Sequence, residues 1–364
     1  MTTKLSDSLS LDRGPAMKNR FSLAPLTNWQ SHADGTLSDD EHDWLVRRAE
    51  GGFAMTMTCA AHVQQGGQGF PGQLGAFSDL HLPGLTRLAQ SIKAHGSVSS
   101  VQLQHSGERA LAEKSGQEVV APFDVPRKNA RAMTTGEVEA LIEDFILAAI
   151  RSEKAGFEGV ELHGAHGYML CAFLDEKRNL RSDGFGGSYE NRTRIFWDII
   201  NGIRARTAAD FQLGVRISPE RFGCAMADST RFAGELMTSG TIDYLDMSLW
   251  DCFMTPEDPD FQDGLIIDHF TRLDRGTTRL GVAGNIRSAP VAQACLDHGA
   301  DFVFIGRSAI VQYDFPLRAI ADPDFVAQEF PVSRDFLKSQ SVSPAFVEYL
   351  ATGWPDYILA EAEA

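Results

Sequence analysis

The sequence predicts a (β/α)8 barrel, in which eight parallel strands close into an inner sheet and helices form an outer ring. Eight short apolar runs recur along the 364 residues, and the segments between them carry a helical apolar period. No change in composition marks a linker between two domains. The regular alternation therefore favours a single barrel, and a doubly wound parallel sheet of similar length stays open as the structural alternative.

The eight apolar runs are the predicted strands, in chain order. Each run is nearly continuous rather than alternating, which suits parallel strands covered on both faces. The first four are "FSLAPLT" (21–27), "GFAMTMTCA" (52–60), "VSSVQLQH" (98–105) and "GVELHG" (159–164). The last four are "QLGVRIS" (212–218), "YLDMSL" (244–249), "LGVAGN" (280–285) and "FVFIGR" (302–307).

The segments between these runs have the signatures of helices. Thr134 and Glu137 have the spacing of a capping box, in which each side chain bonds the backbone N–H of the other residue. An apolar stripe with helical spacing follows, made of Val138, Leu141, Ile142 and Phe145. Residues 191–205 and 288–300 show the same kind of pattern, so we expect helices there as well.

Composition and charge narrow the class of protein. The 33 basic and 49 acidic residues give a net charge of −16, which disfavours nucleic acid and anionic membrane surfaces as partners. The five cysteines are widely spaced and form no C-x-x-C pair, which indicates free thiols rather than a disulfide framework or a zinc site. The N-terminal segment lacks the apolar run of a signal peptide, and no stretch is long enough to span a bilayer. We therefore expect a cytoplasmic protein.

In a barrel of this kind, the chemistry lies at the carboxyl ends of the strands. Polar side chains at those ends are therefore the candidate functional residues. They are Thr27, Gln102, Gln104, His105, His163, Arg216, Asn285 and Arg307. We expect those that take part in the chemistry to meet at one mouth of the barrel.

The stretch "ELHGAHGYML" (161–170) places two histidines, His163 and His166, three positions apart, with Tyr168 close behind. A catalytic zinc site would need a third protein ligand, for which only Glu161 is near in sequence. The residues alone leave three interpretations open: a metal site, structural histidines, or histidines that donate hydrogen bonds or move protons in an active site.

Glycines follow the last two predicted strands. In "GVAGNIRS" and "FIGRSA", Gly284 and Gly306 would let backbone N–H groups approach a phosphate, and Arg307 would add a fixed cation. Phosphate sites after strands seven and eight recur in barrels of this class. The same glycines could instead only shape turns, and the spacing does not decide between the two.

Five stretches together resemble the Old Yellow Enzyme family of flavin-dependent ene-reductases. They are "NRFSLAPLTNW", "VQLQHSGERA", "GFEGVELHGAHGY", "NLRSDGFGGSYENRTR" and "DFVFIGR", and they occur in the expected order. The resemblance covers about residues 15–320, and it implies one FMN-binding barrel domain over 1–364 with a C-terminal extension in 321–364. In that extension, "PAFVEYLATGWPDYILAEAEA" predicts a helix carrying Phe346, Tyr349, Trp354 and Tyr357, which packs on its own barrel or on a neighbouring subunit of a homo-oligomer.

The resemblance implies a non-covalent FMN lying across the barrel mouth. It assigns the Thr27 side chain to flavin O4, Gln102 to the pyrimidine edge, and Arg216 to the region of N1 and O2. The backbone would line the ring, and the glycine-containing ends of the last two strands would hold the phosphate. The complete set is Ala24, Pro25, Leu26, Thr27, Ala60, Gln102, Arg216, Gly284, Asn285, Gly306 and Arg307.

The resemblance also gives the histidine pair a role. His163 and His166 would donate hydrogen bonds to the carbonyl or nitro oxygen of an activated alkene, and Tyr168 would protonate the α-carbon. Trp29 would contact the substrate, or would only pack the first loop. NAD(P)H would reduce the flavin and leave before the small-molecule alkene enters the same mouth.

Three other functions remain as alternatives at this point. A nitrate-ester reductase would use the same flavin and the same pair of histidines. A metal-dependent hydrolase would be built on His163 and His166. A flavin-storing or redox-sensing protein would keep the flavin site without a need for Tyr168.

Overall fold

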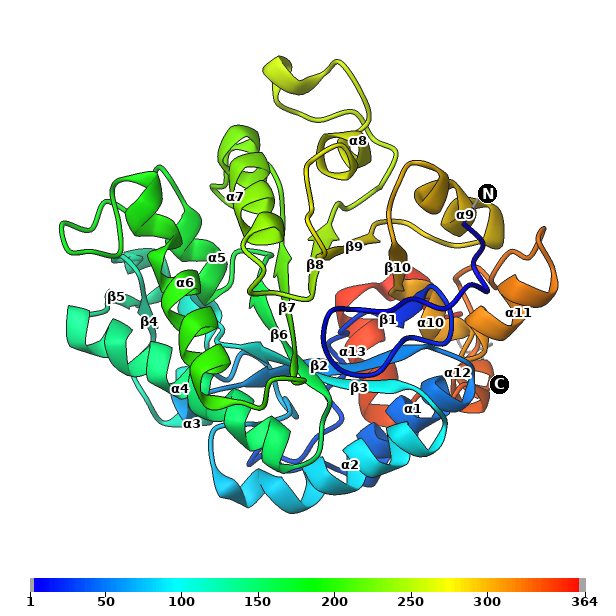
Figure 1. The fold of residues 1–364 in the computed structure, drawn as a ribbon. Coiled ribbons are helices and arrows are strands. Elements are labelled where there is room, and N and C mark those ends of the chain that lie inside the picture. The colour runs from blue at the N-terminus through cyan, green and yellow to red at the C-terminus, as the bar shows by residue number, and fades with distance from the viewer. Residues whose placement is uncertain (1–2, 360–364) are drawn as a thin grey trace.

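The computed structural model describes residues 3–359 and shows a closed barrel of parallel strands (Figure 1). Around the barrel the strands follow the order β1-β10-β9-β8-β7-β6-β3-β2. They are β1 (Phe21–Leu23), β2 (Met55–His62), β3 (Val98–Gln104), β6 (Gly159–Gly164), β7 (Gln212–Ile217), β8 (Tyr244–Ser248), β9 (Arg279–Ala283) and β10 (Phe302–Ile305). Each predicted strand is present, and the predicted barrel is confirmed. The doubly wound alternative is wrong, because β1 pairs with both β2 and β10 and thereby closes the sheet.

Three of these strands end two or more residues earlier than the sequence predicts. β1 stops two residues before Pro25, which lacks the N–H needed to continue the ladder. β9 stops two residues before Asn285, whose φ of 54° turns the chain away. β10 stops just before Gly306, the N-cap of the helix that begins at Arg307. Thr27 and Asn285 therefore lie in turns at the mouth, and Arg307 begins α10 (Arg307–Val311).

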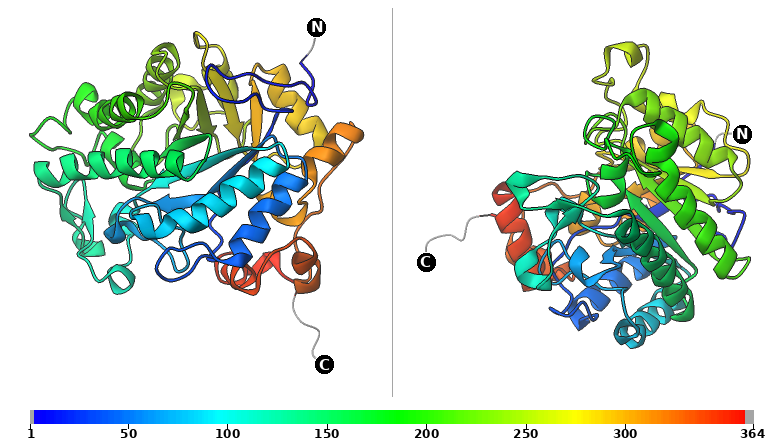
Figure 2. Two further views of the ribbon diagram at one scale, coloured as in Figure 1. Left: turned by 60° about the horizontal axis from the view of Figure 1, so that its bottom comes forward. Right: turned by 90° about the vertical axis from the view of Figure 1, so that its left-hand side faces the viewer.

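Helices cover the outside of the barrel, and Figure 2 shows α1 and α2 lying side by side on it. The longer ones are α1 (Asp39–Glu50), α2 (Leu82–Ala94), α4 (Thr135–Lys154), α6 (Tyr189–Arg206), α7 (Met226–Thr238) and α9 (Ala289–Asp297). Shorter ones are α3 (Ala112–Ser115), α5 (Met169–Leu174), α8 (Ile266–Thr271), α10 (Arg307–Val311) and α11 (Phe315–Ala321). Six 3-10 helices also occur among residues 3–359: η1 (Gln65–Gly67), η2 (Asp79–His81), η3 (Gly107–Arg109), η4 (Pro126–Lys128), η5 (Pro259–Phe261) and η6 (Pro355–Tyr357).

The predicted capping box begins α4. Thr134 Oγ1 accepts from the backbone N–H of Glu137 at 3.2 Å, and Glu137 Oε2 accepts from the N–H of Thr134 at 2.7 Å. Of the predicted apolar stripe, Val138, Leu141 and Phe145 are buried, and Ile142 is partly buried against the core. The predicted helices at 191–205 and 288–300 correspond to α6 and α9.

An excursion between β3 and α4 escaped the prediction. It contains a two-stranded parallel sheet formed by β4 (Val120–Ala121) and β5 (Arg131–Ala132). Strands of two residues carry no periodic pattern, because each presents only one side chain to each face.

The lower half of the barrel interior is filled by aromatic rings. Tyr244 and Phe302 pack edge to face with ring centroids 5.9 Å apart, and Phe304 lies 5.1 Å from Phe302. Gly214 leaves the room that the Tyr244 ring occupies, since a Cβ at this position would lie 2.1 Å from Tyr244 Cζ. The interior below the mouth is therefore a packed core rather than a channel.

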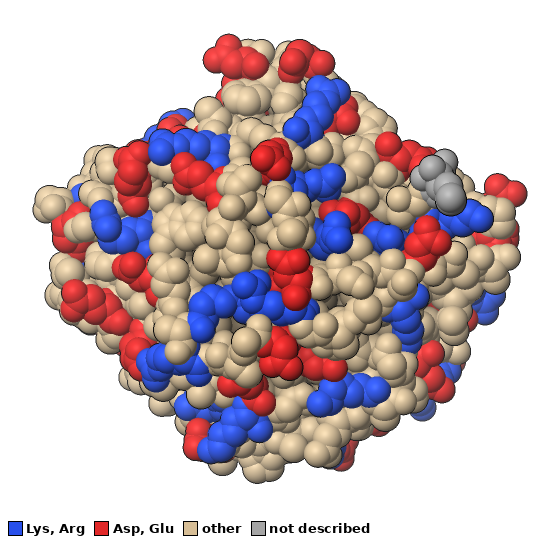
Figure 3. All heavy atoms as spheres, in the orientation of Figure 1, with Lys and Arg blue, Asp and Glu red and all other residues tan. Residues whose placement is uncertain are grey.

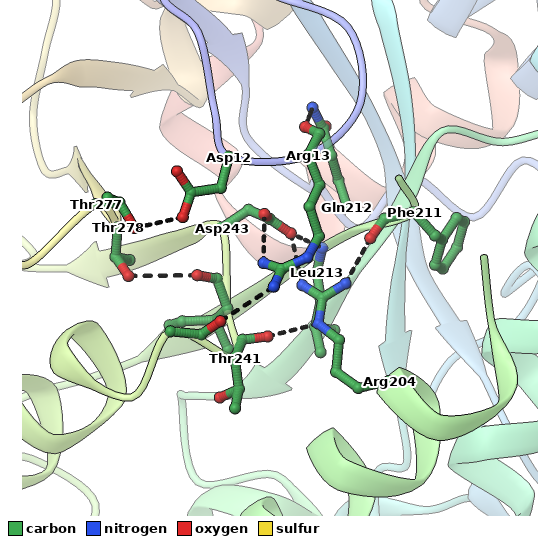
Figure 4. Close-up of polar contacts among 12 residues, drawn as sticks. Asp12, Arg13, Arg204, Phe211, Gln212, Leu213, Thr241, Asp243, Thr277 and Thr278 are labelled. Carbon is green, nitrogen blue, oxygen red and sulfur yellow. Dashed lines mark hydrogen bonds and ion pairs between the residues drawn. The ribbon is translucent and has the colours of Figure 1, made fainter. Parts of the chain in front are cut away.

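A buried carboxylate ties the amino-terminal segment to the floor of the barrel (Figure 4). Asp243 directly precedes β8, and its side chain is fully buried. It accepts from Arg13 Nη1 at 3.1 Å, from Arg204 Nη2 at 2.6 Å and from the backbone N–H of Leu213 at 2.7 Å. One side chain thereby connects the chain before β1, helix α6 and strands β7 and β8 at the end opposite the mouth.

The C-terminal extension packs on its own barrel. It contains α12 (Arg334–Ser339) and α13 (Pro344–Gly353), and Phe346 meets Trp44 of α1 edge to face at 5.5 Å. The expectation that one helix carries all four aromatic residues is wrong for Trp354 and Tyr357. Gly353 ends α13, and a proline follows one residue after Trp354, which prevents the helix from continuing. Residues 360–364 of the predicted tail lie outside the described residues.

The charged side chains on the surface and the cysteine thiols are arranged as follows. On the face shown in Figure 3, acidic and basic side chains are interspersed. All five cysteines are free and buried, as expected. No helix among residues 3–359 combines the length and the apolar character needed to cross a bilayer.

Candidate active site

The predicted trio of His163, His166 and Tyr168 comes together at the carboxyl end of β6. The His163 ring lies 5.1 Å from the His166 ring and 5.3 Å from the Tyr168 ring, centroid to centroid. His166 and Gly167 both have positive φ, at 61° and 73°, so the chain turns sharply and brings the second imidazole back beside the first. Tyr168 is the N-cap of α5, and this position fixes its backbone beside the two histidines.

Both imidazoles are neutral in this environment. Burial lowers the pKa of His163 well below its usual value, and the nearby His166, Arg216 and Arg109 lower it further. Burial, followed by the charges of Arg216 and Arg109, lowers the pKa of His166 to about 3. The pair therefore offers neutral ring N–H donors near pH 7, where a pair of protonated imidazoles would repel each other.

Ser248, at the end of β8, connects His166 to Arg216. Its hydroxyl lies 2.8 Å from His166 Nε2 and accepts from Arg216 Nη2 at 3.3 Å. Because Arg216 can only donate, the serine proton is available for His166 Nε2, and this arrangement favours the tautomer with the proton on Nδ1. The Nδ1–H of His166 is then the donor left for a ligand.

The metal interpretation of the histidine pair loses its support. Glu161, the third ligand that the sequence could offer, accepts from Gln102 Nε2 at 2.7 Å inside the barrel. Within the described part of the chain, residues 3–359, no group of three His, Cys, Asp or Glu side chains is arranged to hold a metal ion.

A layer of buried polar side chains lies between the mouth and the aromatic core. Arg216 Nε is 3.0 Å from Asp246 Oδ2, and both side chains are almost fully buried. Burial and the charge of Asp246 raise the pKa of Glu161 to about 8, and burial raises that of Asp246 to about 6. Gln102 and Arg216, both predicted site residues, belong to this layer, and the guanidinium provides a fixed positive charge under the mouth.

The turn after β1 forms another part of the mouth. Ala24 is buried and donates its N–H to Ile305 O at 3.0 Å, whereas Pro25, Leu26 and Thr27 are half-buried. Ala60 on β2 is also half-buried, and its carbonyl accepts from Gln73 Nε2 at 2.8 Å.

The C-terminal extension reaches this turn through Tyr349. The Tyr349 ring lies 5.2 Å from the ring of Trp29. Burial raises the pKa of Tyr349 to about 12; a hydrogen bond with Thr27 opposes this rise, and the charge of Tyr168 adds to it. Trp29 thus packs against the tail of the chain, beside the mouth. The sequence showed an aromatic tail but gave no sign of which residue would reach the site.

The glycine-containing ends of β9 and β10 carry two arginines. Arg287 Nε donates to Asn285 Oδ1 at 2.9 Å, and Arg307 Nη2 approaches the same oxygen at 3.5 Å. Arg307 Nη1 also donates to the Tyr357 hydroxyl at 3.2 Å. A Cβ on Gly284 would lie 2.9 Å from the backbone nitrogen of Cys252, so only glycine permits this close approach.

Two of the strand-end candidates do not join the mouth. Gln104 accepts from Gln73 Nε2 at 2.9 Å in a buried network. His105 lines a separate cavity together with residues of β4 and α4, and burial lowers its pKa to about 3. Gln104 is the last residue of β3 and His105 follows it, and neither belongs to the group around His163.

Three residues at the mouth were not predicted: Arg109, Ser248 and Tyr349. Ser248 lies near the end of a predicted strand, which was a usable signal. Arg109 lies in the loop after β3 and Tyr349 in the C-terminal extension, where nothing local points to the mouth.

Comparisons with known proteins identify the family and agree with the barrel fold. Residues 12–322 match the model of the NADH:flavin oxidoreductase / NADH oxidase family. The chain is 33% identical over 334 residues to the probable NADH-dependent flavin oxidoreductase YqiG of Bacillus subtilis (strain 168), which covers 86% of this chain and 87% of that protein. It is similar to a structure of morphinone reductase in complex with tetrahydroNAD, at 26% identity and a TM-score of 0.79, covering 100% of this chain and 99% of that one. The old yellow enzyme homologue from Zymomonas mobilis has 25% identity and a TM-score of 0.78, covering 98% of this chain and 100% of that one.

Proposed function

Because the chain belongs to the NADH:flavin oxidoreductase / NADH oxidase family, and within it to the Old Yellow Enzymes, we propose that it reduces activated C=C bonds of small molecules. The chain is an oxidoreductase of a family that uses FMN with NAD(P)H as the electron donor. The proposed substrates are α,β-unsaturated carbonyl compounds and nitroalkenes. The observation that carries the proposal is the close grouping of two neutral imidazoles and a tyrosine at the mouth.

The residues around the mouth fit FMN. Arg216 and Gln102 would hold the pyrimidine part of the flavin through a guanidinium and an amide, and the half-buried turn that ends at Thr27 would contact the ring. Arg287 and Arg307 bring two cations to the ends of β9 and β10, where Gly284 allows close backbone approach. We therefore propose residues 1–364 as one FMN-binding domain, with the cofactor residues Ala24, Pro25, Leu26, Thr27, Ala60, Gln102, Arg216, Gly284, Asn285, Gly306 and Arg307.

FMN, when bound, supplies hydride chemistry, accepting a hydride from NAD(P)H and giving one to the β-carbon of the alkene. The protein's part is to stabilise the charge that develops on the substrate oxygen and to deliver a proton. His163 and His166 would donate two hydrogen bonds to this oxygen. Their donors are neutral and already in place, so they need little reorganisation as the charge grows.

Tyr168 would complete the reaction by giving its phenolic proton to the α-carbon. Its ring lies against that of His163, so the hydroxyl is near the alkene when the oxygen is held by the histidines. Trp29 lies beside the same mouth and would limit the shape of the substrate from the side of the tail.

Anaerobic absorption spectra of the purified protein test the proposal. We expect a flavin band that bleaches on addition of NADPH or NADH and returns on addition of cyclohexenone. A protein that stays colourless after FMN is added would overturn the flavin assignment. A band that bleaches with nucleotide and does not return with any enone or nitroalkene would overturn the alkene as electron acceptor.

A further inference from the structure

We propose that Arg109 binds a carboxylate on the substrate, so that the preferred alkenes are anionic: activated alkenes that carry a carboxylate in addition to the carbonyl or nitro group. The inference rests on the proposed function and deepens it, because it names the substrate class of the same site. It is carried by the position of one cation and by the lack, among residues 3–359, of a hydrogen-bond or ion-pair partner for its side chain.

Arg109 lies directly beside the His163–His166–Tyr168 trio. It ends η3, in the loop that follows β3, and its guanidinium carbon is 5.1 Å from the centre of the Tyr168 ring and 6.0 Å from that of Phe222. Gly167 makes this approach feasible, since a Cβ there would lie 3.1 Å from Arg109 Nη2. The cation therefore stands one ring away from His163, within the length of a small substrate.

The neighbouring carboxylates are bound to another arginine. Glu108 accepts from Arg178 Nη1 at 3.1 Å, and Asp175 accepts from Arg178 Nε at 2.6 Å. Arg216, the other cation near the trio, is paired with Asp246 at 3.0 Å. Within residues 3–359, by contrast, Arg109 makes no hydrogen bond or ion pair through its side chain. Its five N–H donors are available to a ligand.

The charge of Arg109 also reaches the reacting region. It contributes to the lowered pKa of both His163 and His166, which means that an anion placed there would feel its attraction. The chain as a whole carries a net charge of −16, which repels anionic substrates at a distance. A local cation at the mouth is the feature that would let such a substrate bind.

A substrate carboxylate fits this position better than the diphosphate of the nucleotide. The guanidinium fork can donate two parallel hydrogen bonds to a carboxylate or to a phosphate, so its position in the mouth decides between them. In NAD(P)H a ribose separates the nicotinamide from the diphosphate, whereas the Arg109 guanidinium carbon lies 5.1 Å from the centre of the Tyr168 ring, beside the trio that would hold the reacting part. We therefore assign the cation to the alkene that replaces the nucleotide in the mouth.

The test compares two enones that differ in charge and by one methyl group, 4-oxocyclohex-2-ene-1-carboxylate and its methyl ester. In the wild-type holoenzyme we expect a higher kcat/KM for the acid. In Arg109→Gln the acid-to-ester ratio of kcat/KM should fall about 10- to 100-fold, as for the loss of a charged hydrogen-bond pair. Arg109→Lys keeps the charge without the fork and should retain part of the preference.

Arg221→Gln is the matched control. Arg221 also stacks on an aromatic ring, with its guanidinium carbon 4.8 Å from the Trp250 ring, but it is paired with Glu257 at 2.5 Å. Since its charge is already compensated on the surface, the acid-to-ester ratio should change by less than about twofold. An equal loss in both variants would show a general effect of charge and would overturn the assignment to Arg109.

A binding measurement separates this proposal from the proposed function. Phenol and 4-hydroxybenzoate are titrated into the oxidised holoenzyme, and the flavin absorbance gives each Kd. In Arg109→Gln the Kd of 4-hydroxybenzoate should rise at least about tenfold relative to that of phenol. If neither enone is reduced, the proposed function fails, and this titration still tests Arg109. An unchanged Kd ratio, or a raised KM for NAD(P)H with an unchanged acid-to-ester ratio, would overturn the carboxylate site.

Discussion

Tyr168 is the residue at the mouth that separates alkene reduction from simple flavin chemistry. Its ring lies 5.3 Å from that of His163, and the Arg109 guanidinium carbon lies 5.1 Å from the centre of the same tyrosine ring. We expect Tyr168→Phe to slow the reduction of a good enone by about 10²- to 10⁴-fold, because the general acid is lost. Reduction of the flavin by NAD(P)H needs no proton from this residue and should be nearly unchanged. Stopped-flow absorbance measures the two half-reactions separately, and intact enone turnover in the variant would exclude Tyr168 as the proton donor.

Ser248 acts indirectly, by orienting the imidazole of His166. Its hydroxyl lies 2.8 Å from His166 Nε2 and accepts from Arg216, and this arrangement favours a proton on His166 Nδ1, the nitrogen left for a ligand. Ser248→Ala should therefore raise the Kd of phenol about 2- to 10-fold, a smaller effect than that of His166→Ala, because the imidazole itself is kept. Ser248→Thr keeps the hydroxyl and is the control.

Titration of the flavin absorbance with phenol gives the Kd values of the three variants. A Kd for Ser248→Ala that equals the wild-type value would show that the serine does not orient the ring. A loss of phenol binding in Ser248→Thr as well would point to crowding rather than to a missing hydrogen bond.

At the scale of elements, the amino-terminal segment, α6 and two strands depend on one buried carboxylate. Asp243 accepts from Arg13, Arg204 and the backbone of Leu213, and its side chain is fully buried. Asp243→Asn should lower the free energy of unfolding by about 3 kcal/mol or more, because two partly buried arginines lose their counter-charge. Urea unfolding followed by circular dichroism measures the change.

The exposed pair of Arg206 and Glu143, 2.6 Å apart, supplies the matched control for this prediction. Glu143→Gln removes one charge of a surface ion pair and should cost less than about 1 kcal/mol. Equal effects of the two substitutions would contradict the special role of Asp243 in the barrel floor.

The elements that could be predicted are those whose own residues carry the signal. The strand β10 is the continuous apolar run Phe302–Ile305, and Thr134 and Glu137 mark the start of α4. The two-residue strands β4 and β5 have no such local signature and depend on tertiary contacts. Pro25 did signal the end of β1, but the predicted run 21–27 extended past it.

The candidate site follows the same rule. His163, His166 and Tyr168 lie in one stretch of ten residues, so their grouping could be expected from the turn that joins them. Tyr349 comes from a helix almost two hundred residues later, and Arg109 from the loop of another strand. Nothing local indicates that these two side chains reach the trio, because closure of the barrel decides which strand ends are neighbours.

At the scale of the whole molecule, the mouth and the core are joined by the buried polar layer. Glu161 on β6 and Asp246 on β8 are both fully buried, and Arg216 on β7 stands between their strands with its guanidinium next to Asp246. Two carboxylates therefore share one cation in a space closed to water. Such an arrangement disfavours ionisation of both acids at once.

This layer makes the stability of the barrel depend on pH in a stated direction. Burial and Asp246 raise the pKa of Glu161 to about 8, from an ordinary value of 4.5 that it regains in the unfolded chain. The folded state therefore keeps a proton that the unfolded state releases, so the stabilising contribution of Glu161 is complete below about pH 4.5 and is lost as the pH rises to about 8. Glu161→Gln keeps the acceptor for Gln102 and removes this titration.

We expect the unfolding free energy of Glu161→Gln, relative to that of the wild type, to increase with pH between 5 and 8 by up to about 1.4 kcal/mol per pH unit. Taking the difference between the two proteins cancels the opposite contribution of the buried histidines, whose lowered pKa values destabilise the fold in acid. Urea unfolding at several pH values, with FMN in excess for both proteins, gives the comparison. A difference that stays constant across this range would mean that Glu161 is already ionised in the folded barrel. Arg216 would then have to compensate two buried negative charges, those of Glu161 and Asp246.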